Sequence, residues 1–213
     1  MKTMPVIIIG AGGHAKVLLD ALLLTSIPVK GITDTAPEKT GSLILGVAVI
    51  GDDDLVFRYS PDFYWLVNGV GSVGSPERRK TVYEKFKKHG YTFAGVLHPS
   101  AVVAADVSLG EGVQVMAGAI IQTGSCVGEN TIVNTGVRID HDCVIGAHVH
   151  LAPGVTLSGG VRVGENVHIG TAAAAVQGVA IGESAVIAAG AIVTNDIPPG
   201  AMAMGVPARV VQK

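Results

Sequence analysis

Aromatic residues are scarce in this chain of 213 residues: they make up only 4% of it, although 48% of the residues are hydrophobic. A conventional core of this size would normally contain more large rings. Glycine, in contrast, is abundant, with 29 residues. A core of small aliphatic side chains therefore indicates a repetitive, tightly wound structure.

Other absences exclude several classes of protein. The formal net charge is only -2, so we expect no nucleic-acid surface. No apolar run reaches the roughly 20 residues of a membrane helix, so no membrane insertion is expected. No basic segment with a cleavage site precedes the apolar residues 6–9, which predicts a mature, cytoplasmic start. The two cysteines, Cys126 and Cys143, form no framework of spacings and are expected to be reduced thiols.

A six-residue repeat runs through residues 105–194, which divide into fifteen hexads without gap or insertion. The third position of each hexad is small or β-branched, and the fifth is aliphatic throughout. The residues at the fifth position are Leu109, Val115, Ile121, Val127, Val133, Ile139, Ile145, Leu151, Leu157, Val163, Ile169, Ala175, Ile181, Ile187 and Val193. This period suits neither an α-helix nor a hairpin meander.

The hexads instead predict short flat strands, three of which close one triangular coil of eighteen residues. Positions three and five then point inward, and parallel strands of successive coils stack about 4.8 Å apart. Five such coils are expected. An ordinary β-sandwich with coincident spacing is the alternative, and the unbroken run of hexads argues against it.

The first half of the chain has a different pattern. Residues 6–9 form a buried type of strand that leads into Gly10-Ala11-Gly12-Gly13-His14-Ala15 and then an amphipathic helix to about Leu24. A second strand ends at Asp34, about 22 residues after Gly12. This spacing matches the dinucleotide-binding fingerprint in outline, in which glycine N–H groups approach a phosphate at a helix N-terminus. Taken alone, the motif is a weak signal.

Further elements complete a short βαβ-type domain. Strands are predicted at residues 47–50, 63–67 and 92–97, and a helix is predicted from Ser75-Pro76-Glu77 to Gly90. The basic side chains of this helix are interpreted as a solvated face. We expect an α/β fold with a Rossmann-like sugar-nucleotide-binding domain at residues 1–97, followed by a left-handed parallel β-helix at residues 98–213.

Histidines are the candidates for chemistry in the second half. His141 falls at a corner of the coil beside Asp142, whereas His150 and His168 lie one coil apart and should stack on an outward face. An amine must lose a proton to attack a thioester, and imidazole suits a base at neutral pH. A neighbouring carboxylate can hold the ring in one tautomer. From the residues alone, a catalytic pair and a surface turn without a role are equally good interpretations.

The hexads as a whole resemble the left-handed β-helix acyltransferases, and further motifs narrow the resemblance. Gly10-x-Gly12-Gly13-His14-Ala15-Lys16, His98-Pro99-Ser100-Ala101, Asn134-Thr135, Asp140-His141-Asp142-Cys143 and the terminal Gly205-Val206-Pro207-Ala208-Arg209 follow in order. In combination, and over nearly the whole chain, they are similar to the sugar-nucleotide N-acetyltransferases that act on UDP-4-amino-4,6-dideoxy sugars or GDP-perosamine. Sialic acid O-acetyltransferases are close relatives.

The resemblance implies a homotrimer with acyl-CoA sites in clefts between neighbouring β-helices. It implies acetyl transfer from acetyl-CoA to the 4-amino group of a UDP- or GDP-linked 4-amino-4,6-dideoxy sugar, with no metal. It assigns His141 as general base and Asp142 as its support. For the nucleotide sugar, it places Gly12, Gly13 and His14 at the diphosphate, Asp34 near the base or ribose, and Asn134 near the amino sugar. At acetyl-CoA it places His150, Gly159 and Arg209, with Gly159 donating to the thioester carbonyl.

Four other residues have simpler interpretations. Cys143 occupies an inward third position and is predicted to be core, and Cys126 points outward with no histidine in its hexad to activate it. We therefore expect direct transfer in a ternary complex rather than an acyl-enzyme. His148 is expected on the surface, and His168 either joins the CoA cleft or is simply exposed.

Several rival functions remain open. An NAD-dependent oxidoreductase would explain the glycine loop and Asp34 but not the β-helix. A metal hydratase like the gamma-class carbonic anhydrases would need three histidines such as His141, His150 and His168 to meet across subunits, and would leave the first domain without a purpose. A non-catalytic nucleotide-sugar-binding scaffold is a third possibility. Among acetyltransferases, O-acetylation of a sialic-acid-type sugar is the main alternative. The sequence does not choose between UDP, GDP and dTDP as carrier.

Overall fold

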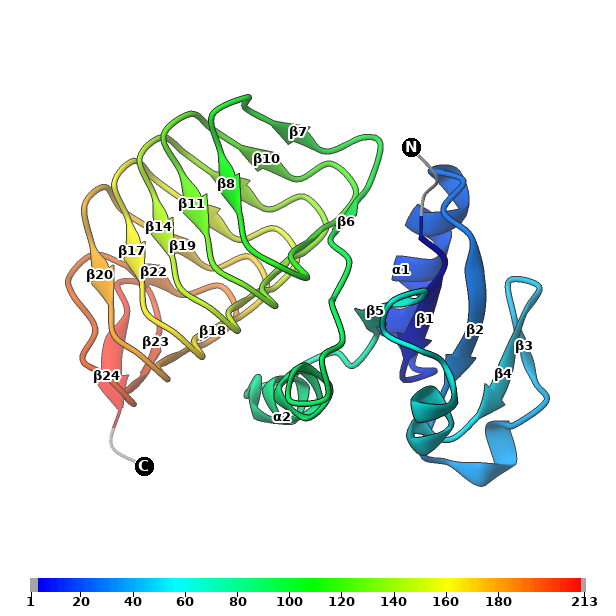
Figure 1. Cartoon of the computed structure of the whole chain (residues 1–213). Coiled ribbons are helices and arrows are strands. Elements are labelled where there is room, and N and C mark those ends of the chain that lie inside the picture. The colour runs from blue at the N-terminus through cyan, green and yellow to red at the C-terminus, as the bar shows by residue number, and fades with distance from the viewer. Residues whose placement is uncertain (1–3, 212–213) are drawn as a thin grey trace.

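The computed structural model describes residues 4–211 and shows an α/β domain packed beside a β-helix (Figure 1). The strands of the first domain form one sheet in the order β3-β4-β2-β1-β5, in which only the edge strand β3 is antiparallel to its neighbour. The strands are β1 (Val6–Ile9), β2 (Val29–Thr33), β3 (Leu43–Ile44), β4 (Val47–Gly51) and β5 (Trp65–Asn68). The helices are α1 (Gly13–Leu24) and α2 (Glu77–Lys87), with short 3-10 turns at Pro37–Lys39 and Asp53–Arg58.

The two helices cover opposite faces of this sheet because successive side chains of a strand point to opposite sides. Ile8 packs with Leu18 and Leu22 of α1, whereas Ile7 packs with Phe86 of α2. The α1 cluster continues into Val96 and Met116, which belong to the β-helix. Helix α1 therefore lies between its own sheet and the β-helix, so that its N-terminus reaches the junction of the two parts.

The β-helix has three parallel sheets, numbered first to third below. The first contains β6 (Val96–Leu97), β9 (Gln114–Val115), β12 (Ile132–Val133), β15 (His150–Leu151), β18 (His168–Ile169), β21 (Val186–Ile187) and β23 (Met202–Met204), with β24 (Arg209–Val211) antiparallel at its end. The second contains β7 (Val102–Val103), β10 (Ile120–Ile121), β13 (Arg138–Ile139), β16 (Thr156–Leu157), β19 (Ala174–Ala175) and β22 (Ile192–Val193). The third contains β8 (Ser108–Leu109), β11 (Cys126–Val127), β14 (Val144–Ile145), β17 (Arg162–Val163) and β20 (Ala180–Ile181).

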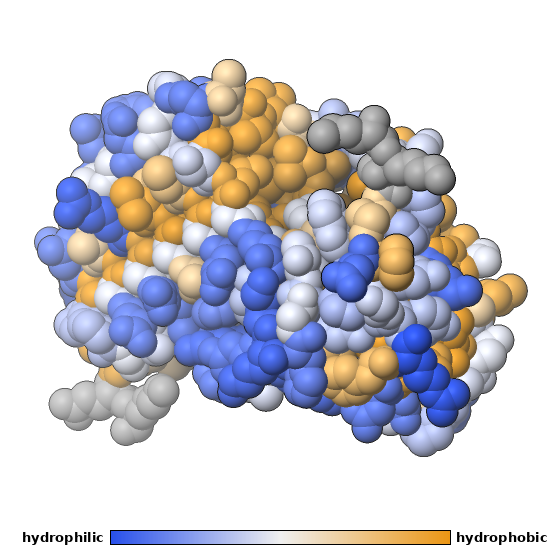
Figure 2. Space-filling view, in the orientation of Figure 1, coloured by the Kyte–Doolittle hydropathy of each residue, from blue (hydrophilic) through white to orange (hydrophobic). Residues whose placement is uncertain are grey.

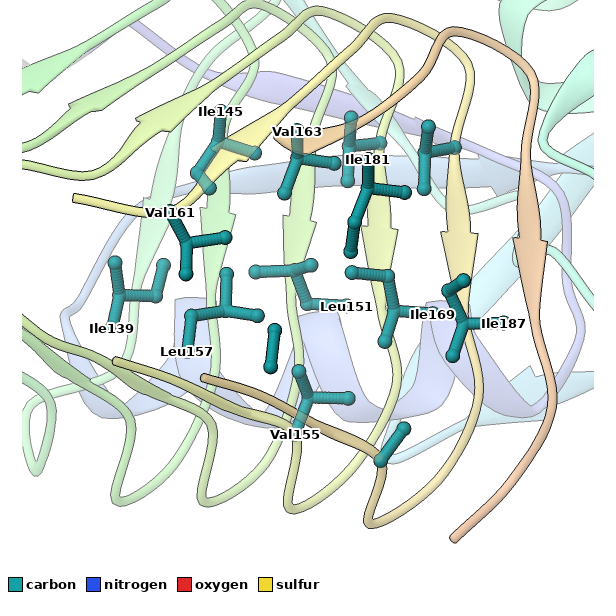
Figure 3. Close-up of a cluster of buried hydrophobic side chains, with 14 of the residues drawn as sticks. Ile139, Ile145, Leu151, Val155, Leu157, Val161, Val163, Ile169, Ile181 and Ile187 are labelled. Atoms are coloured by element: carbon teal, nitrogen blue, oxygen red, sulfur yellow. The ribbon is translucent and has the colours of Figure 1, made fainter. Parts of the chain in front are cut away.

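The predicted register of eighteen residues is confirmed. Ile121 lies beside Ile139, which lies beside Leu157, and the other columns behave in the same way. The side chains of the third and fifth hexad positions form one continuous apolar core (Figure 3). Cys143 is buried in this core as predicted, and Cys126 is exposed. Each buried Leu or Ile contributes about 2 kcal/mol, so the stack of small residues replaces the missing aromatic core.

Each coil turns its corners by one left-handed residue. After the first hexad, the second position has a positive φ both where it is glycine, as at Gly124, and where it is not, as at Asn130, Asp142 and His148. Only glycine tolerates this conformation freely, and Asn, Asp and His follow it in frequency. Asp142, with φ 59°, is therefore held in an unusual backbone conformation.

The segment after α2 corrects the prediction of a last domain strand at residues 92–97. Residues 92–94 pair with β5 through Thr92 O and Ala94 N, but β6 pairs with β9 in the first sheet of the β-helix. One extended segment thus joins the two sheets. The β-helix consequently begins two strands, β6 and β7, before the hexads that could be read in the sequence.

Helix α2 also differs from the prediction of a wholly solvated basic face. Arg79 is only 1% exposed, and its guanidinium donates to the carbonyl oxygens of Asn68 (2.6 Å), Val70 (2.9 Å) and Asn130 (3.1 Å). Asn130 belongs to a corner of the β-helix, so Arg79 links the two parts of the chain. Burial lowers the pKa of Arg79 to about 9, and the side chain remains charged at neutral pH. Neither α1 nor α2, the helices of the described residues, is long and apolar enough to cross a bilayer.

Replacing Arg79 should therefore destabilise the whole molecule. Arg79→Ala leaves three buried carbonyl oxygens without a charged donor, and we expect it to lower the free energy of unfolding by about 3 kcal/mol. Arg78→Ala, which removes the exposed neighbour on the same helix, should change it by less than about 0.5 kcal/mol. Urea unfolding of both variants measures this difference, and equal effects would show that Arg79 does not hold the two parts together.

Candidate functional site

The glycine loop after β1 leaves the N-terminus of α1 open. Gly10 has φ 92°, and a β-carbon at Gly12 or Gly13 would meet nothing within 4 Å. The first turn of α1 contains no acidic residue. The unpaired N–H groups of this turn and the positive end of the helix dipole therefore face free space, an arrangement that suits an anion such as a phosphate.

A cavity of about 520 Å³ lies over this loop, at the carboxyl ends of β1 and β5. In this sheet β2 lies on one side of β1 and β5 on the other, so the strand order changes direction at β1. Open parallel sheets bind ligands at such a switch point, beyond the carboxyl ends of the strands. Both parts of the chain line the cavity. Its walls are residues 10–14 of the glycine loop, Val17, Asp34, Lys39, residues 69–73 after β5, Arg78, and Asn134 and His150 of the β-helix.

Asp34 braces one wall of this cavity. Its carboxylate accepts from the N–H of Ala11 (2.7 Å), the N–H of Ala36 (2.9 Å) and Nζ of Lys39 (2.8 Å). Burial opposes ionisation, but these hydrogen bonds outweigh it and hold the pKa of Asp34 below its usual value. The carboxylate thus positions the glycine loop as well as facing the space where a base or ribose is expected.

His14 connects the glycine loop to the β-helix. Its Nε2 lies 2.7 Å from Oε1 of Gln114 on β9, while Nε2 of Gln114 donates to the carbonyl oxygen of Asn68 at 2.8 Å. Burial and the charge of Arg79 lower the pKa of His14 to about 4. His14 is therefore neutral at physiological pH.

His150 is buried between the two parts of the chain, although its strand position points outward from the β-helix. It is 7% exposed, and its Nδ1 donates to the carbonyl oxygen of Ser72 at 2.9 Å. Its Nε2 accepts from the amide of Asn134 at 3.1 Å. Burial, followed by the neighbouring His168 and His14, lowers the pKa of His150 to about 3. The structure places His150 and Asn134 together in the wall of the cavity described above.

Two more histidines are covered, against expectation. His168 stacks on His150 as predicted, with ring centroids 5.1 Å apart, but it is 9% exposed and does not lie on an open face. His148 was expected on the surface and is buried against Tyr83, with its Nδ1 accepting from Asn130. His148 was misplaced because the hexads show which residues point outward but not that the first domain packs over this one. For His168, exposure is wrong, and a place in the CoA cleft stays a prediction.

His141 lies at the corner between β13 and β14 and is exposed. Its Nδ1 is 2.8 Å from Oδ2 of Asp142, so Nδ1–H donates and the lone pair of Nε2 stays free. The left-handed backbone at Asp142 turns this carboxylate toward the ring of its chain neighbour. The hydrogen bond to Asp142, supported by the charge of Asp140, raises the pKa of His141. This pair has the geometry of a general base and its orienting acid.

Glycines in the coils on either side make room for the pair. A β-carbon at Gly159 would lie 2.5 Å from the His141 ring, and one at Gly124 would collide with the Asp142 carboxylate. The N–H of Gly159 makes no hydrogen bond within residues 4–211. It therefore has no acceptor among the described residues, and the residue itself lies against the ring. Sequence reasoning missed Gly124, whose place one coil before Asp142 was the available signal.

The cavity and His141 are separate in one chain. Asn134 lies at the corner before β13 and His141 at the corner after it, and His141 is not among the residues that line the cavity. Arg209 is further away, exposed on β24, where it donates to the carbonyl oxygen of Ala208. No group of three His, Cys, Asp or Glu side chains within the described part of the chain is arranged to hold a metal ion.

Comparisons with known proteins agree on one family. The model of the PglD N-terminal domain matches residues 5–86, and that of the hexapeptide repeat of succinyl-transferase matches residues 160–195. The structure is similar to perosamine N-acetyltransferase from Caulobacter crescentus, solved with CoA and GDP-perosamine, at 39% identity and a TM-score of 0.91 over 98% of this chain and 97% of that one. The chain belongs to the left-handed β-helix sugar-nucleotide N-acetyltransferases.

A second solved relative is the acetyltransferase domain of PglB from Neisseria gonorrhoeae, in complex with acetyl coenzyme A. It is 34% identical, with a TM-score of 0.90, over 98% of this chain and 100% of that one. No relative is found among curated sequences. The resemblance expected from the motifs is thus confirmed, and the protein is a sugar N-acetyltransferase that uses acetyl-CoA.

Proposed function

We propose that this acetyltransferase acts on the 4-amino group of a GDP-linked 4-amino-4,6-dideoxy sugar. The observation that carries the proposal is the free Nε2 of His141, oriented by Asp142 beside the free N–H of Gly159. The relative solved with CoA and GDP-perosamine supports GDP as the carrier. The cavity over the glycine loop supplies the anion site that the diphosphate needs, at Gly12 and Gly13.

In this reaction, Nε2 of His141 accepts a proton as the sugar amine attacks the thioester carbonyl carbon. The N–H of Gly159 donates to the oxyanion that forms. When the C–S bond breaks, the thiolate of CoA leaves, and the proton on His141 neutralises it. The new bond is an amide, and no acyl-enzyme is needed, because Cys126 and Cys143 both lie outside this arrangement.

A trimer would bring the cavity of one copy to the base of another. His141 does not line the cavity of its own chain, so one subunit alone does not bring the two together. Hydrophobic residues also form a band across the exposed β-helix (Figure 2). Val102 on the second sheet and Val144 on the third are exposed hydrophobic side chains. We propose that these sheets pack in a homotrimer, with acetyl-CoA in the clefts and Arg209 close to its phosphates.

Sedimentation equilibrium tests the trimer. The mass should be three times the 21.7 kDa of one chain, because burying exposed apolar side chains favours association. A particle of one chain that still turns over substrate would contradict the shared site.

The function itself is tested by thiol release from acetyl-CoA. We expect turnover with a GDP-linked 4-amino-4,6-dideoxyhexose, and none with the matching 4-hydroxy sugar, because the base is poised for an amine. The UDP-linked amino sugar tests the carrier. Turnover only with 4-hydroxy sugars or with sialic acid would show that the protein is an O-acetyltransferase and not an N-acetyltransferase.

Removing the acid of the base pair should change the pH profile in a defined direction. Because Asp142 raises the pKa of His141, the base is active above that pKa and is lost as the pH falls through it. Asp142→Asn should move the acidic limb of kcat to lower pH and reduce its maximum. Asp140→Asn should cause a smaller shift in the same direction.

Two further variants test the position of the base. His141→Ala should lower kcat about a hundredfold or more. Gly159→Ala should also lower kcat, because its methyl group occupies the position of the His141 ring. If the acidic limb of the pH–kcat profile is unchanged in Asp142→Asn, or if His141→Ala turns over at a near-normal rate, the pair has no part in the mechanism.

A further inference from the structure

The tautomer of His14 is set by a chain of hydrogen bonds that ends on the backbone. The carbonyl oxygen of Asn68 can only accept, so the group of Gln114 that faces it at 2.8 Å is the amide nitrogen. The amide oxygen of Gln114 then faces His14, 2.7 Å from Nε2. An amide oxygen only accepts, so Nε2 of His14 carries the hydrogen.

The remaining ring nitrogen, Nδ1, is therefore an acceptor. The charged and titratable groups around His14 are Arg79 from α2 and His150 from β15. Burial and the positive charge of Arg79 both oppose a second proton on the ring, and the pKa of His14 is accordingly about 4. Within residues 4–211, Nδ1 has no hydrogen-bond partner, and it is not sealed from solvent. His14 lines the cavity, so this lone pair is what it offers to a ligand.

An acceptor does not suit a phosphate, whose oxygens also accept at neutral pH. It suits a hydroxyl or an amine. The position of His14 favours the sugar as the source, because its bond to Gln114 places it on the β-helix side of the cavity, with Asn134 and His150. Asp34 and Lys39 lie together at the wall formed by the first domain.

We propose that Nδ1 of His14 accepts a hydrogen bond from a hydroxyl or amino hydrogen of the sugar, and that His14 does not hold the diphosphate. The inference rests on the proposed function, because it presumes a nucleotide-linked sugar in the cavity. It leaves the diphosphate to the N–H groups of Gly12 and Gly13. A neutral amine that donates one hydrogen to Nδ1 keeps its lone pair for the attack on the thioester.

Calorimetric titration of the full chain, without acetyl-CoA, tests the proposal. The ligands are GDP, the GDP-linked 4-amino-4,6-dideoxyhexose and the corresponding 4-deoxy sugar nucleotide. His14→Gln keeps an amide that can reach Gln114 but removes the ring acceptor. It should lower the affinity for the amino sugar nucleotide about tenfold, the effect of one hydrogen bond, and leave GDP affinity within about twofold. Asp20→Ala, an exposed change on the same helix, is the control.

The isosteric variant Gln114→Glu is expected to change the affinity for the sugar nucleotide relative to GDP differently, depending on whether His14 binds the sugar or the diphosphate. Its ionised carboxylate would hold a proton on His14 and turn Nδ1 into a donor. It would also lose the hydrogen bond that Gln114 donates to the carbonyl oxygen of Asn68, so its binding is compared only as the ratio of sugar nucleotide to GDP, and His14→Gln is the primary test. If His14 accepts from the sugar, this variant binds the sugar nucleotide more weakly relative to GDP. If His14 serves the diphosphate, both affinities change together and this ratio stays the same.

The outcomes separate the inference from the function on which it rests. A tenfold loss that disappears with the 4-deoxy sugar supports the 4-amino group as donor, and a loss that persists supports a ring hydroxyl. Equal losses for GDP and the sugar nucleotide in His14→Gln would overturn the proposal while leaving the acetyltransferase function intact. A wild-type chain that binds no sugar nucleotide would overturn both. Retained GDP binding shows that the variants are folded.

Discussion

The carbonyl oxygen of Asn68 is the point on which the geometry of the cavity depends. It accepts from Nη1 of Arg79 at 2.6 Å and from Nε2 of Gln114 at 2.8 Å, so both of its lone pairs are used by side chains from different parts of the chain. A buried guanidinium would be costly without such partners, and Arg79 also donates to Val70 and Asn130. These bonds fix the end of β5 against the β-helix, and the loop that follows β5 forms one wall of the cavity.

Burial at the junction of the two parts divides the histidines into two groups, one with lowered and one with raised pKa. His14 and His150 are buried, and burial is the main reason that their pKa values fall to about 4 and about 3. The charge of Arg79 adds to the effect on His14, and the neighbouring His168 and His14 add to the effect on His150. His141 is exposed beside Asp142 and Asp140, and its pKa rises instead. The neutral histidines have fixed tautomers and serve to orient groups by hydrogen bonds. Only the exposed one combines a free lone pair with a neighbouring acid that stabilises its protonated form, which a base requires.

How much could be predicted depended on whether a feature is periodic. The hexads predicted the strands, the eighteen-residue register and the inward position of Cys143, because the core of a β-helix repeats with the sequence. The glycine loop and α1 also followed from local pattern. The residues alone left the contact between His141 and Asp142 open, since adjacent side chains on a strand point apart but need not do so at a corner; the left-handed corner at Asp142 allows the contact. Arg79 and His148 were misplaced because their burial arises only when the two parts pack together.

Periodicity also sets the dimensions of the junction. The outward residues of the first sheet form one column, in which Gln114 and His150 stand two coils, about 10 Å, apart. Gln114 meets Asn68, whereas His150 meets Ser72. The column therefore holds two points of the segment after β5 at a spacing fixed by the stacking of strands. An insertion between these coils would move one contact relative to the other, so the unbroken register is a requirement of the cavity as well as of the core.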